Sequence, residues 1–171
     1  LGSYAMTRLK YPGRRFFKTS IIFSYLIPTA VLFVPMYVFV SKLGFYDNKW
    51  ALLIIYPTTV VPYCCYMLMS YFKAIPYALE EAALIDGCTR MKSLRYIITP
   101  IALPGIAVVA TFAFTMSWNE YLYAMIMTTS PAQQTAVVAI SSFKYADSAI
   151  WGRIMAASVL TSLPVTIIYI V

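Results

Sequence analysis

Four stretches without a charged side chain divide this sequence, and their lengths restrict what the chain can fold into. They are Thr19–Ser41, Trp50–Phe72, Tyr96–Asn119 and Ile154–Val171. The first three hold 23, 23 and 24 residues and the last holds 18, whereas a helix needs about 20 apolar residues to span a membrane. Only 11% of the chain is charged, against about 25% in a soluble domain. The sequence therefore predicts an all-α, polytopic membrane helical bundle that forms one transmembrane domain over residues 1–171.

The ends of the predicted spans differ from the ends of these stretches, because the residues that flank each stretch decide where the membrane surface lies. We expect them at about residues 16–42, 50–73, 97–127 and 152–171. The last stretch stops at Val171 with no polar flank, and Leu1–Thr7 runs straight into a basic cluster, as the tail of an earlier span would. We therefore expect a chain that is truncated at both ends.

The basic residues are distributed unevenly between the two sides of these spans. Nine lie before the first span or between the second and third, namely Arg8, Lys10, Arg14, Arg15, Lys18, Lys73, Arg90, Lys92 and Arg95; four lie elsewhere, namely Lys42, Lys49, Lys144 and Arg153. The positive-inside rule places the nine in the cytoplasm. Residues 8–18 are predicted to set this topology near anionic lipid headgroups, or in addition to contact a cytoplasmic partner. The net charge of +7 thus reports topology and not nucleic-acid binding.

The inner connection from Pro76 to Pro104 reads as a helix, a break and a second helix. Pro76 suits the first position of a helix, because its missing N–H would be unpaired there. Gly87 can take the left-handed conformation that ends a helix, and Thr89 can cap the next one before Pro100 interrupts it. The first helix, at about 76–87, has apolar groups on nearly every side, which a helix free in water would not have. We therefore expect it to bind a partner.

This segment resembles the EAA loop of bacterial ATP-binding-cassette (ABC) importer permeases. The matching residues are Glu81, Ala82, Ala83, Asp86, Gly87, Ile97, Pro100 and Pro104, whereas Cys88 and Thr99 depart from the usual alanine and leucine. The resemblance implies the fold of a type I importer permease in the bacterial cytoplasmic membrane. It also implies that the segment is the coupling helix that docks on the ATPase subunit, with Glu81 pairing with a base there. The implied coupling residues are Glu80, Glu81, Ala82, Ala83, Asp86 and Gly87. The alternative is an amphipathic surface helix between two spans.

A polar cluster at the outer end of the third span, SWNEYLYA, is the candidate translocation path. Its residues are Trp118, Asn119, Glu120, Tyr121 and Tyr123. A carboxylate within a membrane span is costly, so it should face protein or water. Aromatic rings beside hydroxyl and amide groups suit the apolar faces and hydroxyls of sugars. The alternative is an interfacial aromatic belt in which Glu120 forms a salt bridge with Arg153.

SWNEYLYA, AASVLTSLPV and LGSYAMTRLKYPG look like the corresponding stretches of maltose-type carbohydrate permeases. This resemblance implies half of the translocation path of an ATP-driven sugar importer. The implied partners are a second homologous permease, two ATP-binding cassette subunits, an external solute-binding protein and membrane lipid. The alternatives are another solute, such as an amino acid, peptide, polyamine or glycerol phosphate, or a secondary transporter or membrane scaffold.

The chain is predicted not to be an enzyme. It contains no histidine and no GxxxxGK phosphate loop, which removes the usual metal and nucleophile chemistries. We expect no catalytic residue, no metal ligand and no cofactor on this chain. The resemblance implies that ATP and Mg are bound by the partner subunits.

Overall fold

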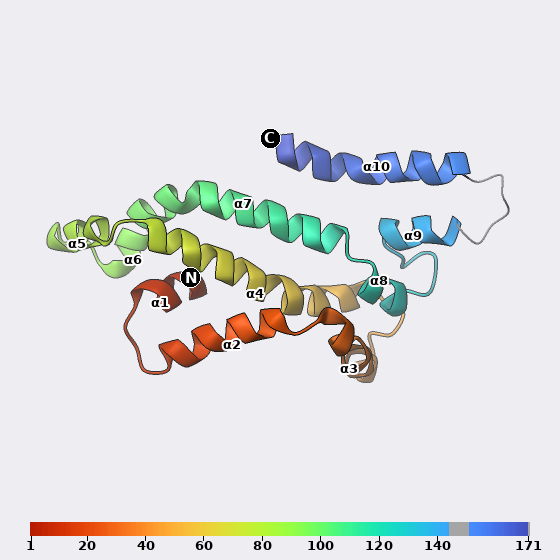
Figure 1. The fold of residues 1–171 in the computed structure, drawn as a ribbon, viewed down its shortest axis with the longest axis horizontal. Coiled ribbons are helices and arrows are strands. Elements are labelled where there is room, and N and C mark those ends of the chain that lie inside the picture. Colours follow the sequence, from red (N-terminus) through yellow and green to blue (C-terminus); the bar gives the residue numbers. More distant parts are fainter. Residues whose placement is uncertain (144–150, 171) are drawn as a thin grey trace. The chain divides into compact units, whose positions relative to one another are not determined.

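The computed structural model describes residues 1–143 and 151–170, and every regular element there is helical (Figure 1). Lys144 lies outside the described residues, as does Val171 at the end of the last predicted span. In chain order the helices are α1 (Gly2–Arg8), α2 (Arg14–Leu26), α3 (Thr29–Lys42), α4 (Trp50–Ala74), α5 (Tyr77–Ile85), α6 (Arg90–Ser93), the π-helical segment η1 (Leu94–Ile98), α7 (Thr99–Trp118), α8 (Leu122–Met127), α9 (Ala136–Ser142) and α10 (Trp151–Ile170).

The chain divides into two compact units, and α4 and α7 contribute residues to both. The first unit comprises Leu1–Leu26 and Val61–Phe112. Its core consists of Tyr4, Phe72, Ile75, Leu94, Ile98 and Ala102. These residues come from α1, the end of α4 and the link after it, η1 and the start of α7. Tyr4 of this core also bonds Glu80 of α5.

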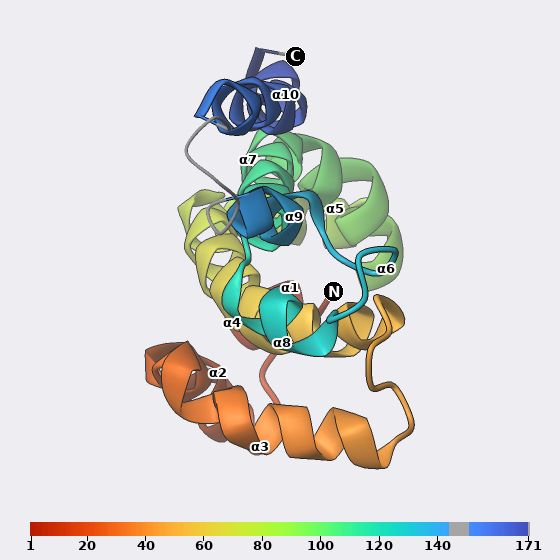
Figure 2. The ribbon, with the colours of Figure 1, turned by 90° about the vertical axis from the view of Figure 1, so that its right-hand side faces the viewer.

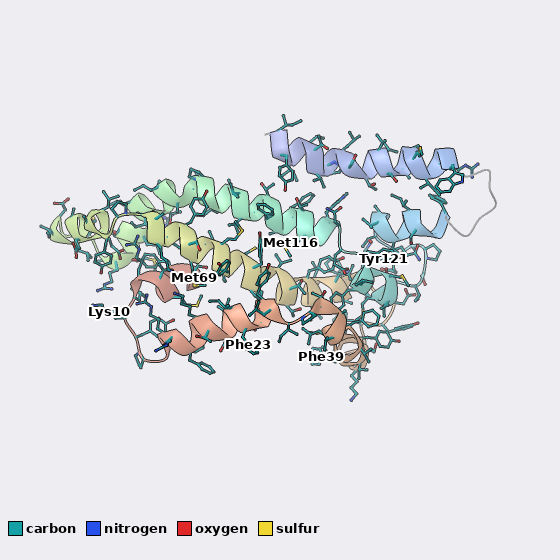
Figure 3. All side chains as sticks on the ribbon, in the orientation of Figure 1. Lys10, Phe23, Phe39, Met69, Met116 and Tyr121 are labelled. Carbon is teal, nitrogen blue, oxygen red and sulfur yellow. The ribbon has the colours of Figure 1, made fainter. Side chains whose placement is uncertain are left out.

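The second unit comprises Ile27–Val60 and Ala113–Val171. Its core consists of Val40, Ala51, Leu52, Ile55, Tyr123, Ala124, Met127 and Val138. Within this unit α8 packs on α3, and α9 packs on the beginning of α10 in the views of both Figure 1 and Figure 2. None of the described side chains of α10 is buried, and Figure 3 shows side chains both above and below this helix. This apolar helix therefore presents nearly its whole surface to whatever surrounds the protein.

Two of the predicted spans are interrupted in the structure. The segment predicted as one span at 16–42 forms α2 and α3, which are separated at Ile27 and Pro28. Pro28 has no N–H to continue α2, and it disfavours helical geometry at Ile27 before it. The segment predicted at 97–127 is helical to Trp118, pauses, and resumes as α8. The physical reason for this second pause is the role of Glu120, described below.

The described residues hold three helices that are long and apolar enough to cross a membrane. These are Trp50–Ala74, Arg90–Trp118 and Trp151–Ile170. The pair α2 and α3 makes a fourth candidate if the two are counted as one broken span. The predicted all-α membrane fold is therefore confirmed.

Candidate functional site

The first helix of the coupling segment ends with the local geometry that its sequence predicts. Pro76 was expected at the first helical position, but α5 begins one residue later, at Tyr77. Gly87 has φ +83°, the left-handed conformation. The Gly87 N–H donates to the Leu84 carbonyl at 3.2 Å, and the Cys88 N–H donates to the Ala83 carbonyl at 2.9 Å. This pair of hydrogen bonds is the Schellman arrangement that closes a helix, and it requires a residue that tolerates positive φ.

The second half of the segment differs from expectation at Pro100. Thr89 caps α6 as predicted, since its hydroxyl accepts the Lys92 N–H at 3.3 Å. Pro100, however, does not interrupt the helix, which is continuous from Arg90 to Trp118. The turn before it widens into η1, where the Thr99 N–H donates to the Leu94 carbonyl five residues back. A π-type turn of this kind relieves the clash between a proline ring and the carbonyl four residues earlier.

Helix α5 has one packed face and one open face. Glu80 and Ala83 are buried, at 1% and 3% exposure. Tyr77, Leu79 and Ile85 are exposed at 44%, 40% and 85%. Four of the predicted coupling residues, namely Glu81, Ala82, Asp86 and Gly87, are exposed as well. Tyr77, Glu81 and Ile85 follow one another at four-residue spacing, so they form one stripe along the helix. The structure therefore places Glu80 and Ala83, also predicted as coupling residues, on the face that packs against the rest of the chain.

The packed face of α5 is held by the first helix of the chain. The Tyr4 hydroxyl donates a hydrogen bond to Glu80 Oε1. The Arg8 guanidinium donates to the carbonyls of Phe72 and Ile75, at and just after the end of α4, where a cation complements the helix dipole. Burial and the neighbouring Glu80 carboxylate raise the pKa of Tyr4 to about 12, so its hydroxyl stays a donor at any physiological pH. Helix α1 thus holds both the end of α4 and the start of the coupling segment.

Sequence reasoning did not find Tyr4 or Arg8 as functional residues. They lie in a short segment that resembles the tail of an earlier helix, and Tyr4 is 76 residues from its partner Glu80. The two adjacent acids Glu80 and Glu81 look equivalent in the sequence. The apolar residues before and after these two acids do not reveal which acid is buried.

Removing the Tyr4 hydroxyl should weaken the first unit. In Tyr4→Phe the Glu80 carboxylate stays buried and loses its donor, and a hydrogen bond to a charged group contributes about 1.5–3 kcal/mol. We expect the thermal midpoint of unfolding in detergent to fall accordingly. Tyr96→Phe is the matched control, because Tyr96 is 69% exposed and the same oxygen is removed. Equal midpoints for the two variants would contradict the assigned role of Tyr4.

The candidate path residues lie in the second unit, where Glu120 has a structural role. Its two carboxylate oxygens accept the N–H groups of Tyr123 and Ala124, each at 3.0 Å. An anion at this position stabilises the first turn of α8. These backbone contacts take the place of the salt bridge with Arg153 that one interpretation of the sequence proposed. They also explain the pause between α7 and α8, because Glu120 must leave the helix to bond the turn that follows it.

Of the neighbouring aromatic residues, Tyr123 is buried and Trp118 borders a cavity. Tyr123 is 3% exposed and donates its hydroxyl to the Thr29 carbonyl at 3.1 Å. Trp118 donates its indole N–H to the Thr161 carbonyl of α10 at 2.9 Å, and its ring stacks on Phe114 at 5.4 Å. Trp118 also borders a cavity of about 370 Å³, whose lining residues are Tyr56, Phe114, Ser117, Trp118, Thr135 and Ala136. Asn119 and Tyr121 lie in the break between α7 and α8.

Comparison with known proteins places this chain in a family. A family profile described as "Binding-protein-dependent transport system inner membrane component" matches residues 1–171. The chain belongs to this family. The predicted ABC importer permease family and the multi-pass location in the cytoplasmic membrane are thereby confirmed.

Curated relatives of this transport family match along almost the whole chain. The inner membrane ABC transporter permease protein YcjP of Escherichia coli strain K12 is 38% identical over 169 residues, which cover 99% of this chain and 60% of that protein. The trehalose/maltose transport system permease protein MalG of Thermococcus litoralis is 33% identical over 98% of this chain and 60% of its own. The diacetylchitobiose uptake system permease protein DasC of Streptomyces coelicolor is 30% identical over 99% of this chain and 61% of its own. The chain thus spans about 60% of the length of these relatives.

A solved structure shares the fold of this family member. It is a bacterial ABC transporter involved in the import of the acidic polysaccharide alginate, with a TM-score of 0.72 and 22% sequence identity. The match covers 98% of this chain and 64% of that one. The helical arrangement is therefore that of an importer permease.

Proposed function

We propose that this chain is a permease subunit of an ATP-driven carbohydrate importer, coupled to its ATPase through α5. The observation that carries the proposal is the open stripe of Tyr77, Glu81 and Ile85. Ile85 is 85% exposed, although it lies on a helix whose opposite face is buried against its own chain. An exposed apolar stripe that is interrupted by one carboxylate is typical of a helix that docks in a groove.

The remaining parts of the importer belong to other subunits in this proposal. ATP and Mg bind two ATP-binding cassette subunits, so this chain is not itself an enzyme. A second homologous permease completes the path, and an external solute-binding protein delivers the cargo. The bare surface of α10 supports contact with a neighbouring membrane subunit or with lipid. The basic residues on the same inner connection as α5 support its placement in the cytoplasm.

Carbohydrate cargo is supported by the relatives and by the cavity next to Trp118. The two sugar systems named above transport trehalose or maltose and diacetylchitobiose by their names. The cavity volume of about 370 Å³ falls within the ~300–1,000 Å³ of small-molecule sites. Its three aromatic rings, from Tyr56, Phe114 and Trp118, suit the apolar face of a sugar ring. The path residues Trp118, Asn119, Glu120, Tyr121 and Tyr123 stay a prediction, with Trp118 the one that borders this cavity.

The coupling role can be tested with Ile85→Asp in the assembled complex in proteoliposomes. Burying a carboxylate in an apolar groove should weaken docking by about 2 kcal/mol or more, as at other interface hot spots. Uptake of a labelled disaccharide and receptor-stimulated ATPase activity should both fall at least about tenfold. The thermal midpoint of the isolated chain should not change, because Ile85 is almost fully exposed.

Ile85→Leu, which keeps the apolar contact, is the matched control and should transport normally. Normal coupling in Ile85→Asp would contradict docking through this stripe. Uptake of a labelled amino acid in place of the disaccharide would leave the coupling role intact and contradict the carbohydrate assignment.

A further inference from the structure

Four aromatic residues join α2, α4 and α7 within the first unit. Tyr25 of α2 stacks on Tyr66 of α4, with ring centroids 6.5 Å apart and an angle of 4° between the ring planes. Tyr25 also contacts Tyr63 at 5.5 Å, and Tyr63 meets Phe112 of α7 edge to face at 6.2 Å. Tyr63 and Tyr66 lie three residues apart, so they share one face of α4. These four residues, the aromatic group, therefore form one continuous surface across three helices.

The rest of the unit does not cover the aromatic group. Tyr25, Tyr66 and Phe112 are 47%, 46% and 37% exposed. Among the described residues, no donor or acceptor bonds the hydroxyls of Tyr25, Tyr63 and Tyr66. Tyr4, in contrast, donates its hydroxyl to a carboxylate of this chain. The three tyrosines of the aromatic group thus keep their hydroxyls for a group from outside the chain.

The depth of these hydroxyls in the membrane makes lipid an unfavourable neighbour. Tyr63 lies next to the midpoint of α4, whose 25 residues form one of the candidate spans. At 1.5 Å per residue it is about 16–20 Å from the two ends of the helix, deeper than the interfacial layer where tyrosines meet headgroups. Hydrocarbon offers a phenolic hydroxyl no hydrogen bond. A polar group at this depth is therefore expected to face water or a ligand.

A helix of a neighbouring membrane subunit is a less suitable occupant than a polar ligand. Membrane helices approach one another closely where their side chains are small, whereas the aromatic group presents some of the largest side chains. Flat rings with hydroxyls between them match a ligand that has both apolar faces and hydroxyls. A sugar ring has both.

We propose that Tyr25, Tyr63, Tyr66 and Phe112 form a sugar-binding subsite in the middle of the membrane. The apolar face of a sugar ring lies on the exposed aromatic rings, and its hydroxyls bond the phenolic oxygens. None of these residues belongs to the candidate path at residues 118–123. The subsite rests on the carbohydrate import proposed above, and it adds residues of the first unit that contact the cargo.

Access from water and protection by sugar test the subsite directly. Tyr66→Cys is made in the full-length permease with Cys64, Cys65 and Cys88 replaced by alanine, and the assembled complex is placed in proteoliposomes. A charged methanethiosulfonate reagent modifies thiolates, which form in water and not in apolar surroundings. We expect modification at position 66. Saturating disaccharide should slow it by about tenfold or more, since the bound sugar shields the thiol.

Val61→Cys in the same cysteine-free background is the matched control. Val61 is 51% exposed on the same helix, and it lies about 140° around the helix from Tyr66. We expect no modification there. Equal modification at both positions, or none at position 66, would overturn the subsite. Modification at position 66 that sugar does not slow would overturn the assignment of sugar as its ligand.

Removing hydroxyls tests their contribution to transport. Tyr25→Phe with Tyr66→Phe keeps both rings and removes two hydrogen bonds, each of which contributes a factor of roughly two to ten. Disaccharide uptake below saturation should fall at least about fivefold, whereas receptor-stimulated ATPase activity should stay near the wild-type value because α5 is unchanged. Tyr96→Phe removes the same oxygen from a residue that is 69% exposed outside the group, and it should transport normally.

The wild type separates failure of the subsite from failure of carbohydrate import. The sugar probes are labelled trehalose, maltose and diacetylchitobiose, after the systems of the relatives, and the variants are assayed with the one that the wild type takes up. Uptake by the double phenylalanine variant at the wild-type rate would overturn the subsite and leave carbohydrate import intact. No uptake of any of the three by the wild type would contradict carbohydrate import and the subsite with it.

Discussion

Gly87→Pro should reduce both transport and receptor-stimulated ATP hydrolysis while the chain still inserts in the membrane. Proline fixes φ near −65°, and position 87 has φ +83°. The substitution also removes the N–H that bonds the Leu84 carbonyl. The local cost of about 3 kcal/mol or more should open the end of α5 and displace Ile85 from its docking position. We expect disaccharide uptake and receptor-stimulated ATPase activity to fall by more than about tenfold.

A second glycine separates this effect from backbone strain in general. Gly44 has φ +81°, and neither it nor Gly87 has an atom within 4 Å of the place where a Cβ would lie. Alanine at either position should therefore cost the same ~1–2 kcal/mol of left-handed strain. Only Gly87→Ala should impair coupling, because Gly44 lies in the loop after α3. Equal impairment by both variants would show that coupling follows stability and not the shape of α5.

Gly105→Val should destabilise the packing of α7 on α4 in the first unit. Gly105 is buried in α7, and a Cβ there would lie 2.5 Å from Cγ of Tyr71, within the volume of its ring. Overpacking of this kind costs about 1–3 kcal/mol, and small residues at such crossings let membrane helices approach closely. We expect a lower thermal midpoint in detergent and reduced yield of the assembled complex.

A second substitution, at Tyr71, should restore part of the stability that Gly105→Val loses. Tyr71→Ala removes the ring, so the double variant Gly105→Val with Tyr71→Ala should be more stable than the sum of the single effects predicts. Gly152→Ala on α10 is the control, since no atom lies within 4 Å of the added methyl. Additive effects in the double variant would mean that Tyr71 does not limit the residue at position 105.

Local signals in the sequence predicted where α5 ends and where α6 begins. Gly87 ends a helix and Thr89 starts one for reasons that lie within a few residues of each. The long apolar runs likewise predicted the helices, because hydrocarbon demands that each backbone group find a partner in its own helix. The expectation of an ATPase partner comes from the family resemblance and from no local pattern.

Contacts between distant residues account for what the sequence did not reveal. The burial of Glu80 depends on Tyr4, and no periodicity connects the two. The continuation of the helix through Pro100 depends on a widened turn, which has the same composition as an ordinary one. The backbone contacts of Glu120 were not predicted, since a carboxylate that bonds the next turn of backbone looks the same in sequence as any other carboxylate.

The contacts of α1 have a mechanical consequence for any transport cycle. Tyr4 holds the coupling segment and Arg8 holds the end of α4, and only three residues separate these two attachment points. A force on α5 would therefore act on α1 as well as on the short link between α4 and α5. The N-terminal segment therefore shares that force, so α1, the end of α4 and the start of α5 should move together.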